Sequence, residues 1–297
     1  LGINPLTWTN DDLPSLGAET SLETCLSEGK EAGFAGFELG NKFPREARLL
    51  GPILQRHDLQ LVSGWYSGRL LERSVEEEIA AVQPHLTLLR ELGAKVLVFA
   101  EVSGCIHGEQ QTPVHLRPRF PQERWKEYGE KLSEFARYTQ QQGVQIAYHH
   151  HMGTVIESAE DVDNLMIHTG EEVGLLLDTG HLMNTNPRLR TEAEAAYFVC
   201  RTVDKLGPYA ELIKGVHLSC SLSGKYLRSF ERKVPANSSA EAIWRHIAAI
   251  DRHKPFTTTA AKQILQCVQP QYVNHELAYE TIEEMIPLMQ QQLSVAR

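Results

Sequence analysis

The stretch VGLLLDTGH, over residues 173–181, is a run of apolar residues that ends in a carboxylate, a glycine and an imidazole. Because the run is apolar at successive positions, it indicates a strand buried on both faces, as in a parallel sheet covered by helices. A second run of this kind, VQIAYHHH over 144–151, ends in three histidines. Both stretches therefore place chemically active side chains where a buried strand stops.

Comparable runs recur along the whole chain and predict eight strands. The 297 residues divide into units of about 37, a plausible length for one strand and one helix. The predicted strands are Gly2–Trp8, Gly36–Leu39, Leu59–Trp65, Lys95–Glu101, Val144–His149, Val173–Asp178, Ile213–Leu218 and Tyr272–Leu277.

Segments of helical period separate these runs. Ser74 and Glu77 form a capping-box pattern at the start of one segment, and Pro84 predicts a kink or split inside it. Alternation without a linker predicts a single (βα)₈ TIM-barrel domain over 1–297. A doubly wound sheet is the alternative, but no Gly-rich phosphate loop follows an early strand. The predicted helices are Ser74–Leu92, Glu123–Gln142, Ser158–Met166, Glu192–Leu206, Ser239–Ile250 and Thr281–Leu293.

Composition narrows the class of protein. The chain is 42% hydrophobic and 23% charged, as in average globular proteins, and its net charge is −9. This acidic balance disfavours a nucleic-acid partner, which calls for a basic surface. No run is long enough to span a membrane, and the chain opens directly on a strand-like segment. Five single cysteines without a C-x-x-C pair indicate reduced thiols, so we expect a cytoplasmic, soluble protein.

Polar residues at the ends of the predicted strands define a candidate active site, because barrel enzymes place their chemistry at the C-terminal ends of the strands. The last four strands end in His149, Asp178, His217 and Glu276. Two imidazoles and two carboxylates without a thiolate suit Mn²⁺, Co²⁺ or Zn²⁺ rather than Ca²⁺. The alternative is a structural polar network that closes the barrel mouth.

Strand alternation assigns the three consecutive histidines to two faces. If His149 points into the barrel, His151 does too, and His150 points toward the helices. At the last strand the same rule admits only one of His275 and Glu276, and we favour the acid as the inward residue. His181 is expected beside the metal ligands or against the substrate.

Several motifs resemble the inosose dehydratases of the xylose-isomerase-like barrel superfamily of sugar isomerases and epimerases. They are NPLTWTNDD, ELGNKFP, LVSGWYSGRLLERSVEEE, AYHHHMGT and LLLDTGH, between Leu1 and about Asn184. The resemblance implies a barrel with one Mn²⁺ or Co²⁺ that dehydrates 2-keto-myo-inositol. In the superfamily the ligands are usually Glu, Asp, His and Glu, so Asp178, His217 and Glu276 match and His149 replaces the first Glu.

We expect His151 and Glu101 to act as acid or base, and Lys42 to hold or protonate a substrate oxygen. The substrate is expected to be a small polyol or sugar, and homo-oligomer formation stays open. The residues expected to contact the substrate are Trp8, Glu38, Trp65, His181 and Lys225.

The likeness to the dehydratases weakens after Asn184, where a basic connection over 219–239 follows the seventh strand. This connection is either a substrate loop or a solvated excursion. Two other functions stay open: a ketose isomerase or epimerase that shares the enediolate, and an inactive barrel that senses a sugar.

Overall fold

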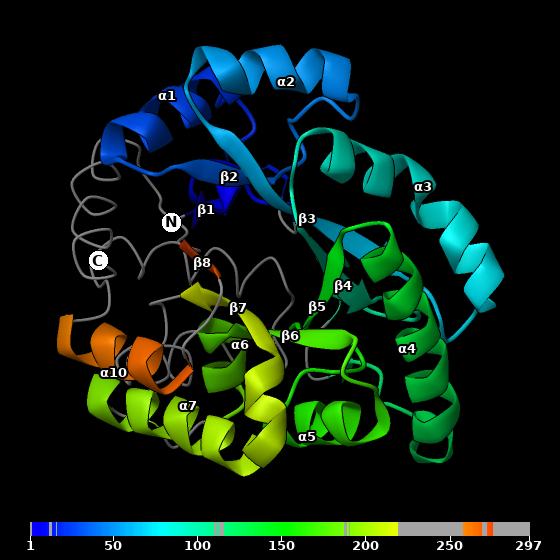
Figure 1. Cartoon of the computed structure of the whole chain (residues 1–297). Helices are drawn as coiled ribbons and strands as arrows, with labels where there is room; N and C mark the ends of the chain where they lie inside the picture. Colours follow the sequence, from blue (N-terminus) through cyan, green and yellow to red (C-terminus); the bar gives the residue numbers. More distant parts are fainter. Residues whose placement is uncertain are drawn as a thin grey trace.

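Eight parallel strands pair in sequence order and close into a barrel, with the helices outside it (Figure 1). Each strand is hydrogen-bonded to the next, and β8 pairs with β1. The TIM-barrel prediction is thus confirmed. The strands are β1 (Gly2–Ile3), β2 (Gly36–Leu39), β3 (Gln60–Gly68), β4 (Val96–Glu101), β5 (Gln145–His149), β6 (Val173–Asp178), β7 (Ile213–Leu218) and β8 (Tyr272–His275).

The computed structural model describes residues 2–11, 14, 15, 17–109, 112, 116–186, 189, 191–218, 258–268 and 272–275. The helices predicted at 239–250 and 281–293, the loop at 219–239, and the predicted site residues Lys225 and Glu276 lie outside these residues. Within the described part of the chain, no helix is both long and apolar enough to cross a bilayer.

The first strand is much shorter than predicted. β1 stops at Ile3, and the 3₁₀ helix η1 (Pro5–Thr7) follows, with Asn4 as its N-cap. The Asn4 side chain accepts a hydrogen bond from the Leu6 backbone N–H at 2.9 Å. Pro5 explains the difference, because it has no N–H for a strand ladder but fits the first turn of a helix. The segment predicted as strand therefore forms a turn at the mouth of the barrel.

Helices form where the capping signals predict them. Ser74 accepts from the backbone of Glu77 at the start of α3, in a full capping box. The same arrangement starts α5 at Ser158 and α7 at Thr191. Further helices are α1, α2, α4, α6 and α10, with 3₁₀ turns η3 and η4. Their bounds are α1 (Leu22–Ala32), α2 (Ala47–Arg56), α3 (Val75–Glu91), η3 (Gln122–Arg124), α4 (Trp125–Gln141), α5 (Ala159–His168), α6 (Thr179–Asn184), α7 (Glu192–Leu206), η4 (Gly207–Leu212) and α10 (Thr258–Val268).

Pro84 does not split its helix, since α3 runs unbroken from Val75 to Glu91. The prediction of a split is therefore wrong. A proline removes a single N–H from the helical ladder. The buried side chains of Val82, Leu86 and Leu89 hold both halves of α3 in the core.

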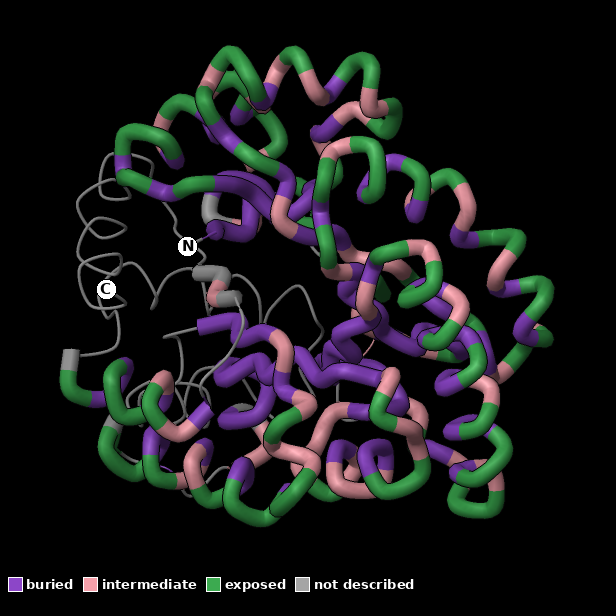
Figure 2. Tube along the Cα trace, in the orientation of Figure 1, coloured by how far each residue is buried: buried purple, intermediate pink, exposed green. Residues whose placement is uncertain are grey.

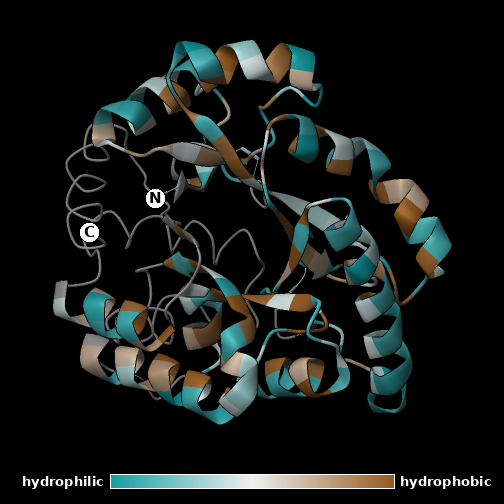
Figure 3. Cartoon of the chain, in the orientation of Figure 1, coloured by the Kyte–Doolittle hydropathy of each residue, from teal (hydrophilic) through white to brown (hydrophobic). Residues whose placement is uncertain are grey.

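Side-chain alternation separates two apolar regions. A small cluster of Val98, Ala147 and Leu176, with Trp65 packed against it, consists of alternate residues of β3 to β6. The large core contains the intervening residues, such as Phe99 and Leu175, and lies between strands and helices. Figure 2 shows the strands as mostly buried, and Figure 3 colours several strand segments as hydrophobic. Residues in register with the small cluster therefore face the barrel interior.

The cysteines are less scattered than the sequence suggests. The structure has free thiols at Cys25, Cys105, Cys200 and Cys267. Sγ of Cys200 on α7 and Sγ of Cys267 on α10 are 2.6 Å apart, although 67 positions separate these residues. Cys220 is outside the described residues.

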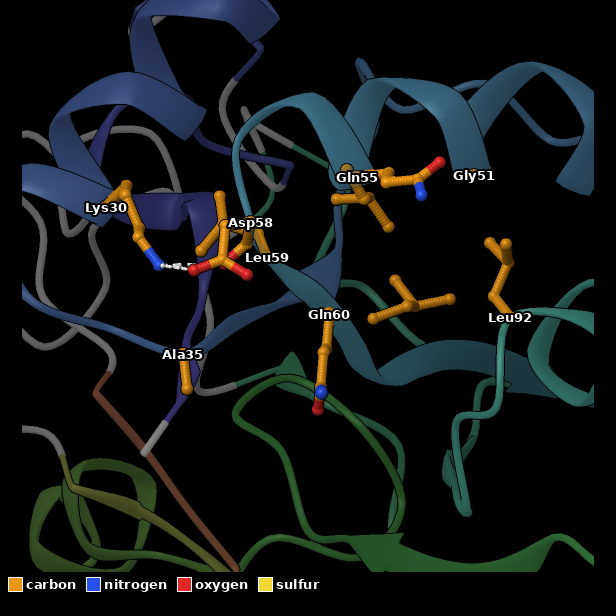
Figure 4. Close-up of a pocket in the computed structure, with 10 residues that line it drawn as sticks. Lys30, Ala35, Gly51, Gln55, Asp58, Leu59, Gln60 and Leu92 are labelled. Carbon is orange, nitrogen blue, oxygen red and sulfur yellow. Dashed lines mark hydrogen bonds and ion pairs between the residues drawn. The ribbon is translucent and has the colours of Figure 1, made fainter.

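A hollow of about 450 Å³ lies at the N-terminal end of β3, against the C-terminal ends of α1 and α2 (Figure 4). Its rim carries the ion pair of Lys30 and Asp58, whose Nζ and Oδ2 are 2.7 Å apart and whose side chains are 41% and 93% exposed. This end of a barrel generally serves stability, whereas chemistry takes place at the opposite end. We therefore do not assign the active site to this hollow, although it is larger than the cavity described below.

Candidate metal centre and active site

Three potential ligand atoms converge at the C-terminal ends of β5, β6 and β7. His149 Nε2 lies 3.2 Å from His217 Nδ1, Asp178 Oδ2 lies 3.5 Å from that Nδ1, and His149 Nε2 lies 3.7 Å from the same Oδ2. Asp178 and His217 are direct partners in the pairing of β6 with β7. All three side chains are at most 2% exposed.

The hydrogen-bond network assigns the proton position of each imidazole. His149 donates from Nδ1 to the His150 carbonyl at 2.9 Å, so its Nε2 carries the lone pair. His217 Nε2 lies 3.4 Å from the carboxylate oxygen Oε2 of Glu38, which can only accept, so the His217 lone pair is at Nδ1. Two nitrogen lone pairs and one carboxylate oxygen therefore face one another.

The two carboxylate oxygens of Asp178 have different environments. Oδ1 accepts from the His181 backbone N–H at 2.7 Å, which caps α6. Oδ2 is buried and accepts no hydrogen bond. An unsatisfied carboxylate oxygen opposite two lone pairs is costly unless a cation lies between them.

Charge states of the buried groups match those that metal ligands need. Burial, followed by the charge of His217, lowers the pKa of His149 well below its usual value. Burial opposes ionisation of Asp178, but the neighbouring His181, His217 and His149 hold its pKa well below the usual range. Near neutral pH these groups are a neutral imidazole and a carboxylate, which are the ligating forms.

The dimensions of this ligand set also fit a metal ion. The three edges average about 3.5 Å, which places each atom about 2.0 Å from the centre of the triangle, close to a metal–nitrogen or metal–oxygen bond length. His149, Asp178 and His181 also offer ligand atoms within 4.8 Å of one another. However, His181 Nδ1 accepts from the Met152 backbone N–H at 3.3 Å, which leaves its proton on Nε2. His217 is therefore the better third ligand.

A cavity of about 230 Å³ opens beside these atoms. Trp65 forms one wall, and its ring meets the rings of His149 and His151 edge-on at centroid distances of 5.4 and 5.3 Å. Its indole N–H donates to Ser67 Oγ at 2.8 Å. The described residues that line the cavity are Asn4, Leu6, Asp11, Glu38, Leu39, Trp65, Ser67, His107, His149, His151 and His217.

The cavity brings together five of the residues predicted from the sequence, namely Glu38, Trp65, His149, His151 and His217. Asp178 and His181 adjoin it through their contacts with His149, at 3.7 Å between atoms and 5.4 Å between ring centroids respectively. His150 does not line it, and its Nε2 instead accepts from the Asp178 backbone N–H at 3.2 Å.

Two residues predicted to lie in the site, Lys42 and Trp8, do not line the cavity. Lys42 donates from Nζ to the backbone carbonyls of Gly17, Ala18 and Thr20. The indole N–H of Trp8 donates to Glu28 at 2.5 Å, and its ring packs on Phe37. These two side chains fasten surface and core segments of the barrel rather than facing a substrate.

Glu101 is also absent from the cavity lining, because successive side chains of β4 point to opposite faces of the strand. Val98 faces the barrel interior, so Phe99 and Glu101 face the helices. The Glu101 carboxylate accepts from the backbone N–H groups of Ser103 and Leu71 at 3.0 and 3.3 Å. Burial raises its pKa to about 7.

Sequence reasoning missed Asn4, Asp11, Ser67 and His107, which line the cavity. Asn4 and Ser67 had a detectable signal, since Asn4 directly follows the short β1 and Ser67 shares the inward face of β3 with Trp65. Asp11 and His107 come from loops, where no periodicity shows the direction of a side chain.

A closed barrel of eight parallel strands with a convergent His–Asp–His set defines a class of (βα)₈ proteins with a candidate metal site at the strand ends. More specifically, the chain belongs to the xylose isomerase-like TIM barrel family, because the sequence model of this family matches residues 26–258.

Similar proteins include several with a named activity. The rhizopine catabolism protein MocC of Rhizobium meliloti is 52% identical over 181 residues, which is 61% of this chain and 56% of that protein. Inosose dehydratase of Geobacillus thermodenitrificans is 42% identical over 62% of both chains. Inosose dehydratase of Clostridium perfringens is 37% identical over 73% of this chain and 70% of that protein. The chain thus spans less than two thirds of the first two relatives, and the resemblance to inosose dehydratases is confirmed.

Solved structures share the fold at low sequence identity. A probable 3-DHS dehydratase, AsbF of Bacillus anthracis, superposes with a TM-score of 0.60 at 14% identity and covers 99% of this chain and 97% of its own. A barrel protein of Mycobacterium smegmatis, solved in complex with magnesium, has a TM-score of 0.64 at 15% identity, with 100% and 96% covered. These matches support the fold alone.

Proposed function

We propose that this protein is a metal-dependent hydro-lyase that removes water from 2-keto-myo-inositol to give a trihydroxycyclohexane-dione. The activity named for relatives at 37–42% identity supports this substrate. The single observation that carries the proposal is the set of three ligand atoms of His149, Asp178 and His217, which converge beside a polar cavity. We further propose that residues 1–297 form one domain, and that the enzyme is cytoplasmic.

The metal we propose is Mn²⁺ or Co²⁺, with Zn²⁺ as the next choice, because the donors are two imidazoles and oxygen ligands. Glu276 is proposed as the fourth ligand. When bound, the ion would polarise the carbonyl oxygen and an adjacent hydroxyl oxygen of the substrate. The proton transfers in the reaction are assigned to side chains of the protein.

His151 is the proposed base. Its Nδ1–H donates to the Met152 carbonyl at 2.8 Å, so the lone pair is at Nε2. Burial lowers the pKa of His151 to about 4, which keeps the imidazole neutral at physiological pH. A neutral imidazole that lines the cavity can accept the proton from the carbon next to the carbonyl.

His181 is the proposed hydrogen-bond donor to the departing hydroxyl, because burial lowers its pKa well below the usual value and keeps the ring neutral. Its ring lies 4.0 Å from that of His151, and its Nδ1 accepts from the Met152 N–H, so the Nε2–H is the donor. As the α C–H bond breaks, its electron pair forms the carbon–carbon double bond, and the β C–O bond breaks with its pair on oxygen. That oxygen takes the proton that His151 has removed and leaves as water, and the resulting enol rearranges to the dione.

Product analysis tests this function. The purified chain, reconstituted with Mn²⁺ and supplied with 2-keto-myo-inositol, is expected to release a dione lighter by one water, as measured by mass spectrometry and absorbance. The control is Asp178→Asn, which removes a ligand charge with little change of shape. An isomeric product of unchanged mass would replace the lyase with an isomerase or epimerase, and binding without turnover would indicate a sensor.

A further inference from the structure

Glu38, at the inner face of β2, is held from two sides. Asn4 Nδ2 donates to its Oε1 at 3.0 Å, and Ser63 Oγ on β3 donates to its Oε2 at 2.6 Å. The side chain is 4% exposed. Both oxygens accept hydrogen bonds from neighbouring side chains, which fixes the orientation of the carboxylate. Because the carboxylate is already held in place, little further conformational entropy is lost when a neighbouring side chain binds a metal ion.

The neighbour that this carboxylate meets is His217. Its Nε2 lies 3.4 Å from Glu38 Oε2, the same oxygen that Ser63 holds. Because the carboxylate accepts, the His217 proton stays on Nε2 and the lone pair on Nδ1. Nδ1 is the atom that lies 3.2 Å from His149 Nε2 and 3.5 Å from Asp178 Oδ2.

We propose that Glu38 is a positioning residue that holds His217 in the tautomer required for metal binding. This inference rests on the proposed metal site and differs from the sequence-based expectation that Glu38 contacts the substrate. A carboxylate behind a metal-bound histidine fixes the ring orientation and raises ligand basicity. Asn4 and Ser63 support the site in turn, because they fix the carboxylate.

Without Glu38, the other tautomer of His217 becomes favourable. Its proton would then lie on Nδ1, where Asp178 Oδ2 at 3.5 Å and the His149 Nε2 lone pair at 3.2 Å can both accept it. That proton would satisfy the buried carboxylate oxygen that now has no hydrogen bond, and it would occupy the place of the cation. Metal binding would then require displacement of that proton and its hydrogen bond.

Metal titration by calorimetry tests the inference on the whole chain, with Mn²⁺ as the probe. Glu38→Ala is expected to raise the Kd at least about tenfold. Glu38→Gln retains an oxygen that can accept from Nε2, so a smaller loss is expected. Glu101→Gln is the matched control, because it removes another buried carboxylate at a strand end, one that faces the helices and does not line the cavity, and its Kd is expected to stay within about twofold of wild type.

Absorption of the Co²⁺-loaded proteins supplies a second readout, because the spectrum reports the ligands and geometry of the ion. The Glu38→Ala spectrum is expected to differ from that of wild type, and the Glu101→Gln spectrum to match it. Wild-type Kd and spectrum in Glu38→Ala would overturn the inference. Should that variant not fold, a wild-type Kd in folded Glu38→Gln would overturn it. A wild-type chain that binds no metal would instead refute the proposed function.

Discussion

The chemistry of this site is decided by which nitrogen of each histidine carries a proton. Backbone carbonyls hold the Nδ1 protons of His149 and His151, whereas a backbone N–H occupies Nδ1 of His181. Neighbouring histidines are thereby suited to the different roles proposed for them, as metal ligand, base and hydrogen-bond donor. The sequence identifies these residues as histidines, but the tautomers of His149 and His151 depend on the local backbone, and that of His181 depends on a partner from another segment.

Replacement of His149 by glutamate tests the ligand that departs from the usual set of the superfamily. His149→Glu is expected to keep Mn²⁺ bound, because carboxylates suit the same ions. The added negative charge beside Asp178 opposes the charge that develops on the substrate oxygen. Dehydration is expected to fall at least about tenfold, or about 1.4 kcal/mol of barrier. Turnover is compared with metal content, and an unchanged rate at full occupancy would refute a chemical role for the imidazole.

Glu101 predicts a pH dependence of stability that is separate from catalysis. Burial raises its pKa from 4.5 to about 7, so the folded protein favours the neutral acid. Its stabilising contribution is complete below about pH 4.5 and is lost as the pH rises through about 7, a difference of roughly 3 kcal/mol. Glu101→Gln, which cannot ionise, is therefore expected to gain stability relative to wild type between pH 5 and pH 8. Urea unfolding at both values measures this, and an equal difference at the two would contradict it.

At the level of elements, the loop that follows β5 is held by one buried arginine. The Arg117 side chain is 4% exposed, and it donates to the carbonyls of Thr154 and Val155 at 3.0 and 3.2 Å. It also pairs with Glu157 at 3.2 Å and Asp161 at 3.0 Å, the latter being in the capping box of α5. These contacts tie the β4–α4 connection to the loop that carries His151.

Loss of this arginine is expected to destabilise the barrel and loosen that loop. Arg117→Met leaves two partly buried carboxylates without their cation, which costs roughly 3 kcal/mol. The control is Arg137→Met, whose partner Glu172 lies 3.0 Å away but whose own side chain is 53% exposed, so a loss of at most about 1 kcal/mol is expected. Urea denaturation measures both variants, and equal losses would show that Arg117 is not a buried clamp.

The strands, and the convergence of His149, Asp178 and His217, could be predicted because apolar runs such as Val173–Asp178 indicate buried strands and end in these polar residues. β1 was overestimated because Pro5 starts a 3₁₀ turn within an apolar-looking segment. Glu101 ends a strand as predicted, but its side chain faces the helices. This direction follows from side-chain alternation along β4, once Val98 is known to face the barrel interior. Lys42 and Trp8 find partners in other segments, which no local pattern encodes.

Over the whole molecule, closure of the barrel brings the ligands together. His149, Asp178 and His217 are distant in sequence, yet successive strand pairings place them within 3.7 Å. In the unfolded chain these residues are too far apart to bind one ion strongly. A metal that occupies the site therefore binds the folded protein alone, and its binding free energy adds to the free energy of unfolding.

Metal binding is accordingly expected to raise the thermal stability of the whole barrel. At a free Mn²⁺ concentration about 100 times the Kd, the folded state gains about 2.7 kcal/mol, enough to raise the Tm by several degrees. A chelator is expected to reverse this gain. In Asp178→Asn, which replaces the carboxylate of the unsatisfied Oδ2 by a neutral amide, the gain is expected to disappear, whereas Arg137→Met, far from the site on α4, should retain it. Calorimetric scans with Mn²⁺ and with chelator measure the effect. An equal rise in wild type and Asp178→Asn would place the bound ion elsewhere on the molecule, because the stabilisation would then not depend on the strand ends that barrel closure brings together.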